Sequence, residues 1–230
     1  MYKSIIVLLI MIALKEFLGY KEYKKSKYSE ASGNAYGQVR FNKGNYGEYD
    51  TFRLLEKFNI YKKLLTNIYL PTKDGGMTEV DLVMISKKGI FVFESKNYSG
   101  WIYGDDRHKT WTQTFKNGKK EKFFNPIWQN NGHITNIKRA LNIEDDELFK
   151  SYIVFSQRCT LKKISNKSKD TFVGYRGGMI KGIYRKLNKM PDLITIEEVK
   201  KIYKQLDRYT NVSNDIKLKH IQGIKTKIEK

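Results

Sequence analysis

The sequence predicts an α/β fold in which helices flank a mixed β-sheet, with a hydrophobic helix at the N-terminus. Residues 80–86 and 89–96 are short apolar runs separated by two lysines, a pattern typical of two strands joined by a tight turn. Residues 44–58 show helical periodicity, and Asn125-Pro126 is a helix-start signal. Helices at these two places are expected to pack on the sheet.

The N-terminal region contains an unbroken apolar run, residues 5–14, which is followed directly by Lys15-Glu16. The run is shorter than the roughly 20 residues that span a bilayer, so a signal peptide, a buried helix and a short membrane anchor are all open. We favour an anchor over residues 1–25, because the lysines at both ends of the run reach the interface. Further lysines then place the rest of the chain in the cytoplasm; the alternative is a soluble cytoplasmic protein.

A polar linker is expected over residues 26–43, which are rich in Ser, Gly and Asn and lack apolar periodicity. The main domain is predicted over residues 44–210 and begins with a helix over 44–58, where aromatic and aliphatic residues recur at three-residue steps. Glu48 falls in the first turn of this helix. There it either stabilises the positive helix end or faces a metal site, and we favour the second. Residues 64–70 predict the first strand.

The hairpin of residues 80–96 gathers three charged side chains. A two-residue turn places Asp81 opposite Glu94 and puts both on one face with Lys96, whereas a three-residue turn would shift the register by one. Neighbouring carboxylates in apolar surroundings need a cation, and oxygen ligands favour Mg²⁺ or Mn²⁺ over Zn²⁺. The alternative is a surface salt-bridge cluster, which the aliphatic character of both strands disfavours.

Further strands are predicted beyond the hairpin. Residues 99–103 and 110–115 form a second hairpin, and a turn at Asn117-Gly118 leads into residues 122–124. For the aromatic residues of this region, sheet packing is favoured over base stacking. The lysines form either a phosphate-facing rim or a solvated edge that blocks strand pairing. The aromatic residues are Trp101, Tyr103, Trp111 and Phe115, and the lysines are Lys116, Lys119, Lys120 and Lys122.

A helix is predicted to start at Asn125, which serves as the N-cap before a proline. Gln129 and His133 then lie one turn apart on one face of this helix. They are expected to contact phosphate or to order the attacking water, with Gln129 the better candidate. A lone histidine is otherwise more often a surface or core residue.

The C-terminal part of the domain predicts two more strands, over residues 151–156 and 171–175, and a helix that ends near Lys189. A second helix, over residues 195–207, starts with the capping box formed by Thr195 and the glutamate three positions later. Residues 211–230 are a basic tail, either a frayed end or a nucleic-acid arm.

Composition favours a polyanionic partner. The 230 residues include 44 Lys and Arg against 24 Asp and Glu, a formal net charge of +20. Such a charge suits nucleic acid or anionic lipid, although a lysine-rich composition also reflects an AT-rich genome. The single cysteine, Cys159, excludes an internal disulfide and a cysteine-based zinc site within this sequence.

Five separated motifs occur in one order and resemble the nuclease-related domain (NERD), within the PD-(D/E)xK nuclease superfamily. The resemblance spans residues 42–141 and is specific because of this order, whereas a bare D…ExK pattern would be weak. One departure is that Val80, not proline, precedes Asp81. The motifs are Gly47-Glu48, Thr78-Glu79-Val80-Asp81, Gly89-Ile90-Phe91-Val92-Phe93-Glu94-Ser95-Lys96-Asn97, Ser99-Gly100-Trp101-Ile102-Tyr103-Gly104 and Asn125-Pro126-x-x-Gln129-Asn130-x-x-His133.

The resemblance implies a restriction-endonuclease-like core and a metal-dependent nuclease that hydrolyses phosphodiester bonds, with DNA favoured over RNA. Asp81, Glu94 and Glu48 would then bind Mg²⁺ or Mn²⁺, and Lys96 would orient the nucleophile and offset developing charge. Gln129 would assist them, while His133 and the four lysines would contact nucleic acid. The alternative function is a catalytically silent, membrane-tethered nucleic-acid-binding module. A weaker one is that the basic surface serves anionic lipid.

Overall fold

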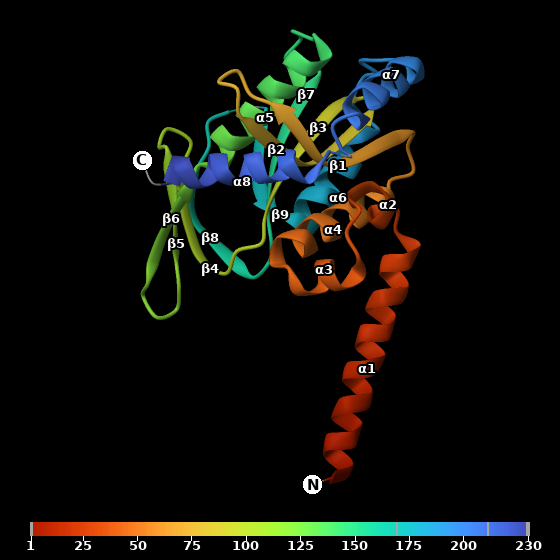
Figure 1. The fold of residues 1–230 in the computed structure, drawn as a ribbon, viewed down its shortest axis with the longest axis vertical. Coiled ribbons are helices and arrows are strands. Elements are labelled where there is room, and N and C mark those ends of the chain that lie inside the picture. Colours follow the sequence, from red (N-terminus) through yellow and green to blue (C-terminus); the bar gives the residue numbers. More distant parts are fainter. Residues whose placement is uncertain (1, 169, 211, 229–230) are drawn as a thin grey trace.

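The computed structural model describes residues 2–168, 170–210 and 212–228, and within them the chain forms two β-sheets with helices packed around them (Figure 1). The first sheet has the strand order β1-β2-β3-β7-β9 and the second β6-β5-β4-β8. Each contains parallel and antiparallel pairs, so the predicted mixed α/β architecture is confirmed.

The strands are β1 Lys62–Pro71, β2 Met77–Ser86, β3 Gly89–Lys96, β4 Gly100–Asp105, β5 Thr110–Thr114, β6 Lys120–Phe124, β7 Phe149–Phe155, β8 Cys159–Ser165 and β9 Thr171–Tyr175. The helices are α1 Tyr2–Lys25, α2 Tyr28–Ser32, α3 Tyr36–Phe41, α4 Lys43–Glu56, α5 Pro126–Leu141, α6 Arg176–Leu187, α7 Ile196–Asp207 and α8 Asn214–Ile228. Strand β8 had not been predicted; the other strands lie where the sequence placed them.

The β2–β3 hairpin has the predicted two-residue loop. Ser86 pairs with Gly89 and Val83 with Val92, so the register carries Asp81 toward Glu94 at the far end of the hairpin. Gly89 has φ +116°, and a Cβ there would lie 2.6 Å from a backbone carbonyl oxygen. Only glycine fits this turn without displacing the backbone, which fixes the register.

The first sheet separates two hydrophobic clusters. Alternate residues of β2 point to opposite faces, so Val83 lies in one cluster and Leu82 in the other. Helices α5 and α7 cover the Val83 face, and α4 and α6 cover the Leu82 face. A third cluster, centred on Trp111 and Phe155, packs the second sheet against β7 and the start of α5. This packing places the ends of β2 and β3 between α4 and α5.

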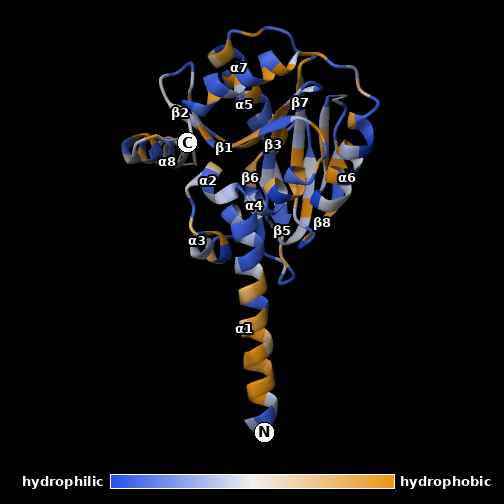
Figure 2. Ribbon diagram, turned by 90° about the vertical axis from the view of Figure 1, so that its right-hand side faces the viewer, coloured by the Kyte–Doolittle hydropathy of each residue, from blue (hydrophilic) through white to orange (hydrophobic). Residues whose placement is uncertain are grey.

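Helix α1 projects away from the two sheets, and its apolar side chains are exposed (Figures 1 and 2). Among the described residues, no helix has both the length and the apolar content required to cross a membrane. The predicted membrane-spanning anchor over residues 1–25 is therefore not supported. The physical reason is that the apolar run ends at Lys15 and Glu16, and Glu16 forms an ion pair with Arg40 of α3.

Residues 26–43, expected to be a polar linker, form α2 and α3 instead. Tyr28 and Val39 are buried in the core, because the aromatic ring of Tyr28 packs edge-on against Tyr49 and Phe52 of α4. These few apolar residues lack a periodic pattern but still anchor the segment. The predicted tail, residues 211–230, contains α8; its residues 211, 229 and 230 lie outside the described residues.

Candidate active site

The hairpin of β2 and β3 ends in two carboxylates. Leu82 pairs with Phe93, so Asp81 and Glu94 follow this pair on their strands. The backbone N–H of Ser95 donates to Asp81 Oδ2 over 2.8 Å. The strand pairing expected from the sequence thus brings Asp81 to the strand segment that carries Glu94 and Lys96.

Glu94 is 1 % exposed and has a partner for each oxygen. Lys96 Nζ lies 2.6 Å from Oε1, and His133 Nε2 lies 3.0 Å from Oε2. Lys96 Nζ also donates to Gln129 Oε1 over 3.1 Å. Burial by itself raises the pKa of Glu94, but the charge of Lys96 and the hydrogen bond from His133 outweigh it, and the pKa is lowered. Glu94 is therefore ionised, and each of its two oxygens has a partner.

Lys96 is held in its charged form. Its side chain is only 14 % exposed, and burial favours the neutral amine. The adjacent charge of Glu94 outweighs this effect and raises the pKa of Lys96. A protonated lysine with two oriented oxygen partners, Glu94 and Gln129, is thus fixed beside the carboxylates.

Glu48 and Asp81 carry the opposite perturbation. Burial, followed by the charges of Glu79 and Glu94, raises the pKa of Glu48 to about 7. Burial, followed by the charges of Glu94 and Glu48, raises the pKa of Asp81 well above its usual range. The hydroxyl of Tyr28 donates to Glu48 Oε2 over 3.2 Å. These two carboxyl groups therefore have less compensating positive charge than Glu94 has.

Helix α4 brings Glu48 to the site through a close approach. A Cβ on Gly47 would lie 3.2 Å from Cβ of Asn97, just beyond β3, so a glycine lets the helix sit against the end of the strand. Thr51 Oγ1, one turn on, lies 3.3 Å from Ser95 Oγ. Glu48 is in the second turn of α4, not in the first as predicted, because Asn42 caps the helix and α4 begins at Lys43. Stabilisation of the positive end of the helix therefore does not account for Glu48 at this position.

The remaining predicted residues, His133 and the four lysines, lie in different environments. His133 is 3 % exposed, and its ring lies between Glu94 and Thr78, with Nδ1 3.1 Å from Thr78 Oγ1. The four predicted lysines are exposed on β6 and the turn before it, and none of them contacts a carboxylate of the candidate site among the described residues. Their positions are Lys116, Lys119, Lys120 and Lys122, of which Lys119 forms an ion pair with Glu121.

Three residues of the site were not predicted. Tyr28 lies in the segment expected to be a linker, where no apolar periodicity predicts a helix. Glu79 and Thr78 belong to one of the five motifs, but the sequence assigns neither of them a role of its own. Strand alternation was the available signal for Glu79, because residues 79 and 81 are two apart on one strand. In the structure the hydroxyl of Tyr69 donates to Glu79 over 2.6 Å, and the charge of Glu79 contributes to the raised pKa of Glu48.

Only some of the carboxylate oxygens in the candidate site are free to bind a hard cation. Among the described residues, no group of three or more His, Cys, Asp and Glu side chains is gathered closely enough to hold a metal ion. Within the same residues, Asp81 Oδ1 and Glu48 Oε1 make no hydrogen bond, whereas both oxygens of Glu94 are engaged. Free carboxylate oxygens with raised pKa values fit Mg²⁺ or Mn²⁺. Asp81 and Glu48 are accordingly the better candidate ligands.

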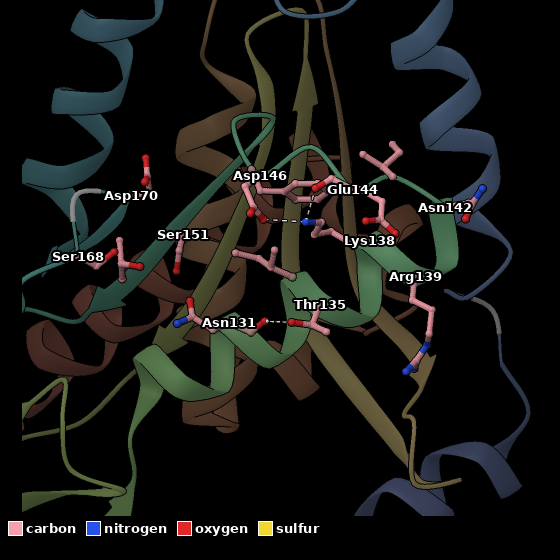
Figure 3. A pocket seen from close by; sticks show the side chains of 14 residues that line it. Asn131, Thr135, Lys138, Arg139, Asn142, Glu144, Asp146, Ser151, Ser168 and Asp170 are labelled. Carbon is pink, nitrogen blue, oxygen red and sulfur yellow. Dashed lines mark hydrogen bonds and ion pairs between the residues drawn. The ribbon is translucent and has the colours of Figure 1, made fainter.

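A cavity of about 620 Å³ lies elsewhere, on the side of α5 that carries Asn131 and Thr135 (Figure 3). Large cavities are the usual first candidates for a ligand site. Here, however, the ammonium of Lys138 already contacts Asp146 and a backbone carbonyl, and none of the predicted catalytic residues lines the cavity. The cluster of carboxylates around Lys96 is therefore the stronger functional candidate, because charge is concentrated there.

Together, the fold and this cluster define an α/β protein whose acidic residues and lysine gather at the ends of two paired strands. Residues 43–156 match the family described as the nuclease-related domain. Over 189 residues the chain is 34 % identical to an uncharacterised protein of Bacillus anthracis, covering 82 % of this chain and 86 % of the relative. No solved structure matches the chain. The chain belongs to the NERD family, and its membership of the PD-(D/E)xK superfamily is consistent with that match.

Proposed function

We propose that this chain is a metal-dependent nuclease that hydrolyses phosphodiester bonds. The observation that carries the proposal is the gathering of three carboxylates and one lysine at one place on the first sheet. Glu94 is buried, the other three side chains are half-buried, and the pKa values of Asp81 and Glu48 are raised. Burying such charges destabilises a fold unless they are compensated, and perturbed carboxyl groups of this kind cluster at functional sites. The family supports nuclease character, and the resemblance favours DNA over RNA as substrate.

Asp81 and Glu48 would hold Mg²⁺ or Mn²⁺, with Glu94 and the carbonyl oxygen of Ser95 as further oxygen donors. When bound, the cation would polarise the scissile phosphate and lower the pKa of a water molecule, so that no side-chain nucleophile is required. The oxygen-rich donor set supports this choice over zinc, because the candidate donors include no thiolate and the imidazole of His133 is engaged by Glu94 and Thr78.

Lys96 would act on the phosphate directly. Glu94 and Gln129 hold its ammonium in one place and keep it protonated. A fixed positive charge stabilises the extra negative charge that develops as phosphorus becomes pentavalent, and it needs no reorganisation at that moment. Glu94 therefore has a second role in this proposal, which is to orient Lys96.

His133 and Tyr28 would position the carboxylates. His133 connects Glu94 to Thr78, which fixes the orientation of the imidazole ring and of the carboxylate. Tyr28 donates a hydrogen bond to Glu48 from α2, a segment outside the matched family region. Neither side chain is proposed to contact the substrate.

The test is cleavage of single- and double-stranded DNA and RNA by the full chain, with Mg²⁺, with Mn²⁺ and with EDTA. We expect cleavage only with metal, and faster on DNA. Asp170→Asn is a suitable control for Asp81→Asn, since Asp170 is an exposed acid just before β9, the edge strand of the first sheet, and its variant should cleave normally. If no substrate is cleaved with either metal, the site does not turn over, and the chain is a nucleic-acid-binding module that has kept the fold.

A further inference from the structure

The second sheet has one buried face and one exposed face. Trp111 and Ile102 point into the hydrophobic cluster shared with β7 and α5. Neighbouring residues of a strand point to opposite sides, so Trp101 and Tyr103 of β4 point outward, and they are 44 % and 37 % exposed. The expectation that the aromatic residues here serve sheet packing therefore holds for Trp111 but not for Trp101 and Tyr103.

Strand pairing arranges the exposed face in two parallel rows. Directly paired residues project to the same side of a sheet, so each row can be followed across the strands. The first row runs Lys120, Thr114, Trp101 and Thr160, and the second runs Lys122, Thr112, Tyr103 and Lys163; of these residues Thr114 is buried. Each row therefore has one aromatic ring in the middle, a threonine beside it and a lysine at the β6 edge.

Positive charge surrounds the rings. Lys162 Nζ lies 5.5 Å from the centroid of the Trp101 ring. At this bulge in the β4–β8 pairing, Lys162 and Lys163 are both exposed. Asp105, two residues after Tyr103 on β4, is already paired with Arg107. An apolar protein partner or a partner with a basic surface would gain little from such a face, whereas a polyanion with aromatic groups matches it.

We propose that this face, which we call the β4 platform (Trp101, Tyr103, Lys120, Lys122, Lys162 and Lys163), binds single-stranded nucleic acid. Unpaired bases stack on Trp101 and Tyr103, and phosphates contact the lysines at the two edges. Base stacking on exposed aromatic rings of a four-stranded sheet is a sequence-tolerant mode of recognition. The two rings are two residues apart on one strand, about 6.6 Å, a spacing that suits successive bases.

Chain connections link the β4 platform to the candidate active site. Strand β3, which carries Lys96, leads into β4 after three residues, and β6 leads directly into α5, which carries Gln129. Short connections therefore join the strands of the platform to the elements that carry Lys96 and Gln129. Delivery to the site rests on the proposed function, but binding to the platform does not require cleavage.

The test is binding of a short fluorescein-labelled oligothymidylate, followed by fluorescence anisotropy in EDTA at one ionic strength. The variants are Trp101→Ala with Tyr103→Ala, Trp101→Phe with Tyr103→Phe, and the control Tyr61→Ala, which removes an exposed tyrosine outside the second sheet. We expect the double alanine variant to lose affinity about tenfold or more. The double phenylalanine variant should keep most of the affinity, and the control should bind like the wild type.

An abasic oligomer of the same length separates stacking from charge. It should bind the wild type and the double alanine variant equally, because it carries phosphates but no bases. The proposal fails if the double alanine variant binds oligothymidylate like the wild type, or if it loses the same affinity for the abasic oligomer. Melting temperatures of all variants check the fold. Because EDTA prevents metal-dependent cleavage, this result and the nuclease assay can fail independently.

Discussion

Lys96 and Lys120 carry the same side chain, but the two sheets give them different environments. Lys96 is buried at the end of the first sheet, where Glu94 and Gln129 fix its ammonium. Lys120 is exposed at the edge of the second sheet. A buried charge interacts strongly with a few fixed partners, whereas an exposed one acts through screened contacts shared with its neighbours. The comparison teaches that position in the fold, more than residue type, separates a chemical role from a binding role.

The buried site should respond most strongly to a divalent cation. Millimolar Mg²⁺ or Mn²⁺ should raise the thermal midpoint of the wild type, because a ligand that binds only the folded state stabilises it by about 2.7 kcal/mol at a hundred times its dissociation constant. Asp81→Asn should abolish this shift. Thermal melting with and without metal is the measurement.

Asp170→Asn is the matched control, since it removes the same charge from an exposed acid. Its midpoint should rise with metal as the wild type does. An equal rise in the midpoint of the Asp81→Asn variant would mean that the cation binds somewhere other than at the candidate active site.

Stability without metal should fall as pH rises. The pKa of Glu48 is about 7 in the folded chain against roughly 4.3 when unfolded, so between these values the folded state binds more protons. Its stability therefore decreases with rising pH, and the penalty is complete above about pH 7. Glu48→Gln removes this penalty. Relative to the difference between variant and wild type at pH 5, the variant should therefore gain about 2–3 kcal/mol of stability at pH 8.

Denaturant melts at both pH values in EDTA measure this effect. The raised pKa of Asp81 acts in the same direction, so a smaller slope with pH should remain in the variant. Stability that rises between pH 5 and pH 8 in the wild type would contradict the burial of uncompensated carboxyl groups.

The exposed platform should show the smallest effects. Lys120→Ala with Lys122→Ala should lower the slope of log affinity against log salt by about 1.4 for single strands, roughly 0.7 for each phosphate contact. Lys200→Ala with Lys204→Ala removes the same charge from the exposed face of α7. Binding titrations at several salt concentrations should leave the slope of this control unchanged. Equal losses in both variants would indicate bulk charge without a defined platform.

Turn and helix-cap signals, which depend on neighbouring residues, predicted the hairpin that carries the candidate active site. The two lysines and Gly89 specified a tight turn, and that turn set the register which leads to Asp81 and Glu94. Asn125 and Thr195 cap their helices as predicted, and α7 has the predicted end. These features depend on neighbours in sequence, so the sequence displays them.

Long-range packing was not predictable in the same way. Strand β8 carries two consecutive exposed lysines, Lys162 and Lys163, which interrupt the alternation expected of a strand. It pairs in parallel with β4, which lies more than fifty residues earlier. Tyr28 reaches Glu48 from a segment with no periodic pattern. His133 belongs with Glu94 only because α5 crosses the end of β3. In each case the partner comes from a distant element, and one sequence without its fold does not identify it.

The central claim is tested most directly by replacing Lys96. Cleavage in Mg²⁺ and binding in EDTA are measured for the wild type, Lys96→Ala, Asp81→Asn and the control Lys200→Ala at one ionic strength, with melting temperatures to check the fold. Lys96→Ala should cleave at least about a hundredfold more slowly and bind with nearly unchanged affinity, because many lysines share the phosphate contacts. Asp81→Asn should also lose cleavage but bind as tightly or more tightly. If Lys96→Ala cleaves as fast as the wild type, these buried residues are not a nuclease site.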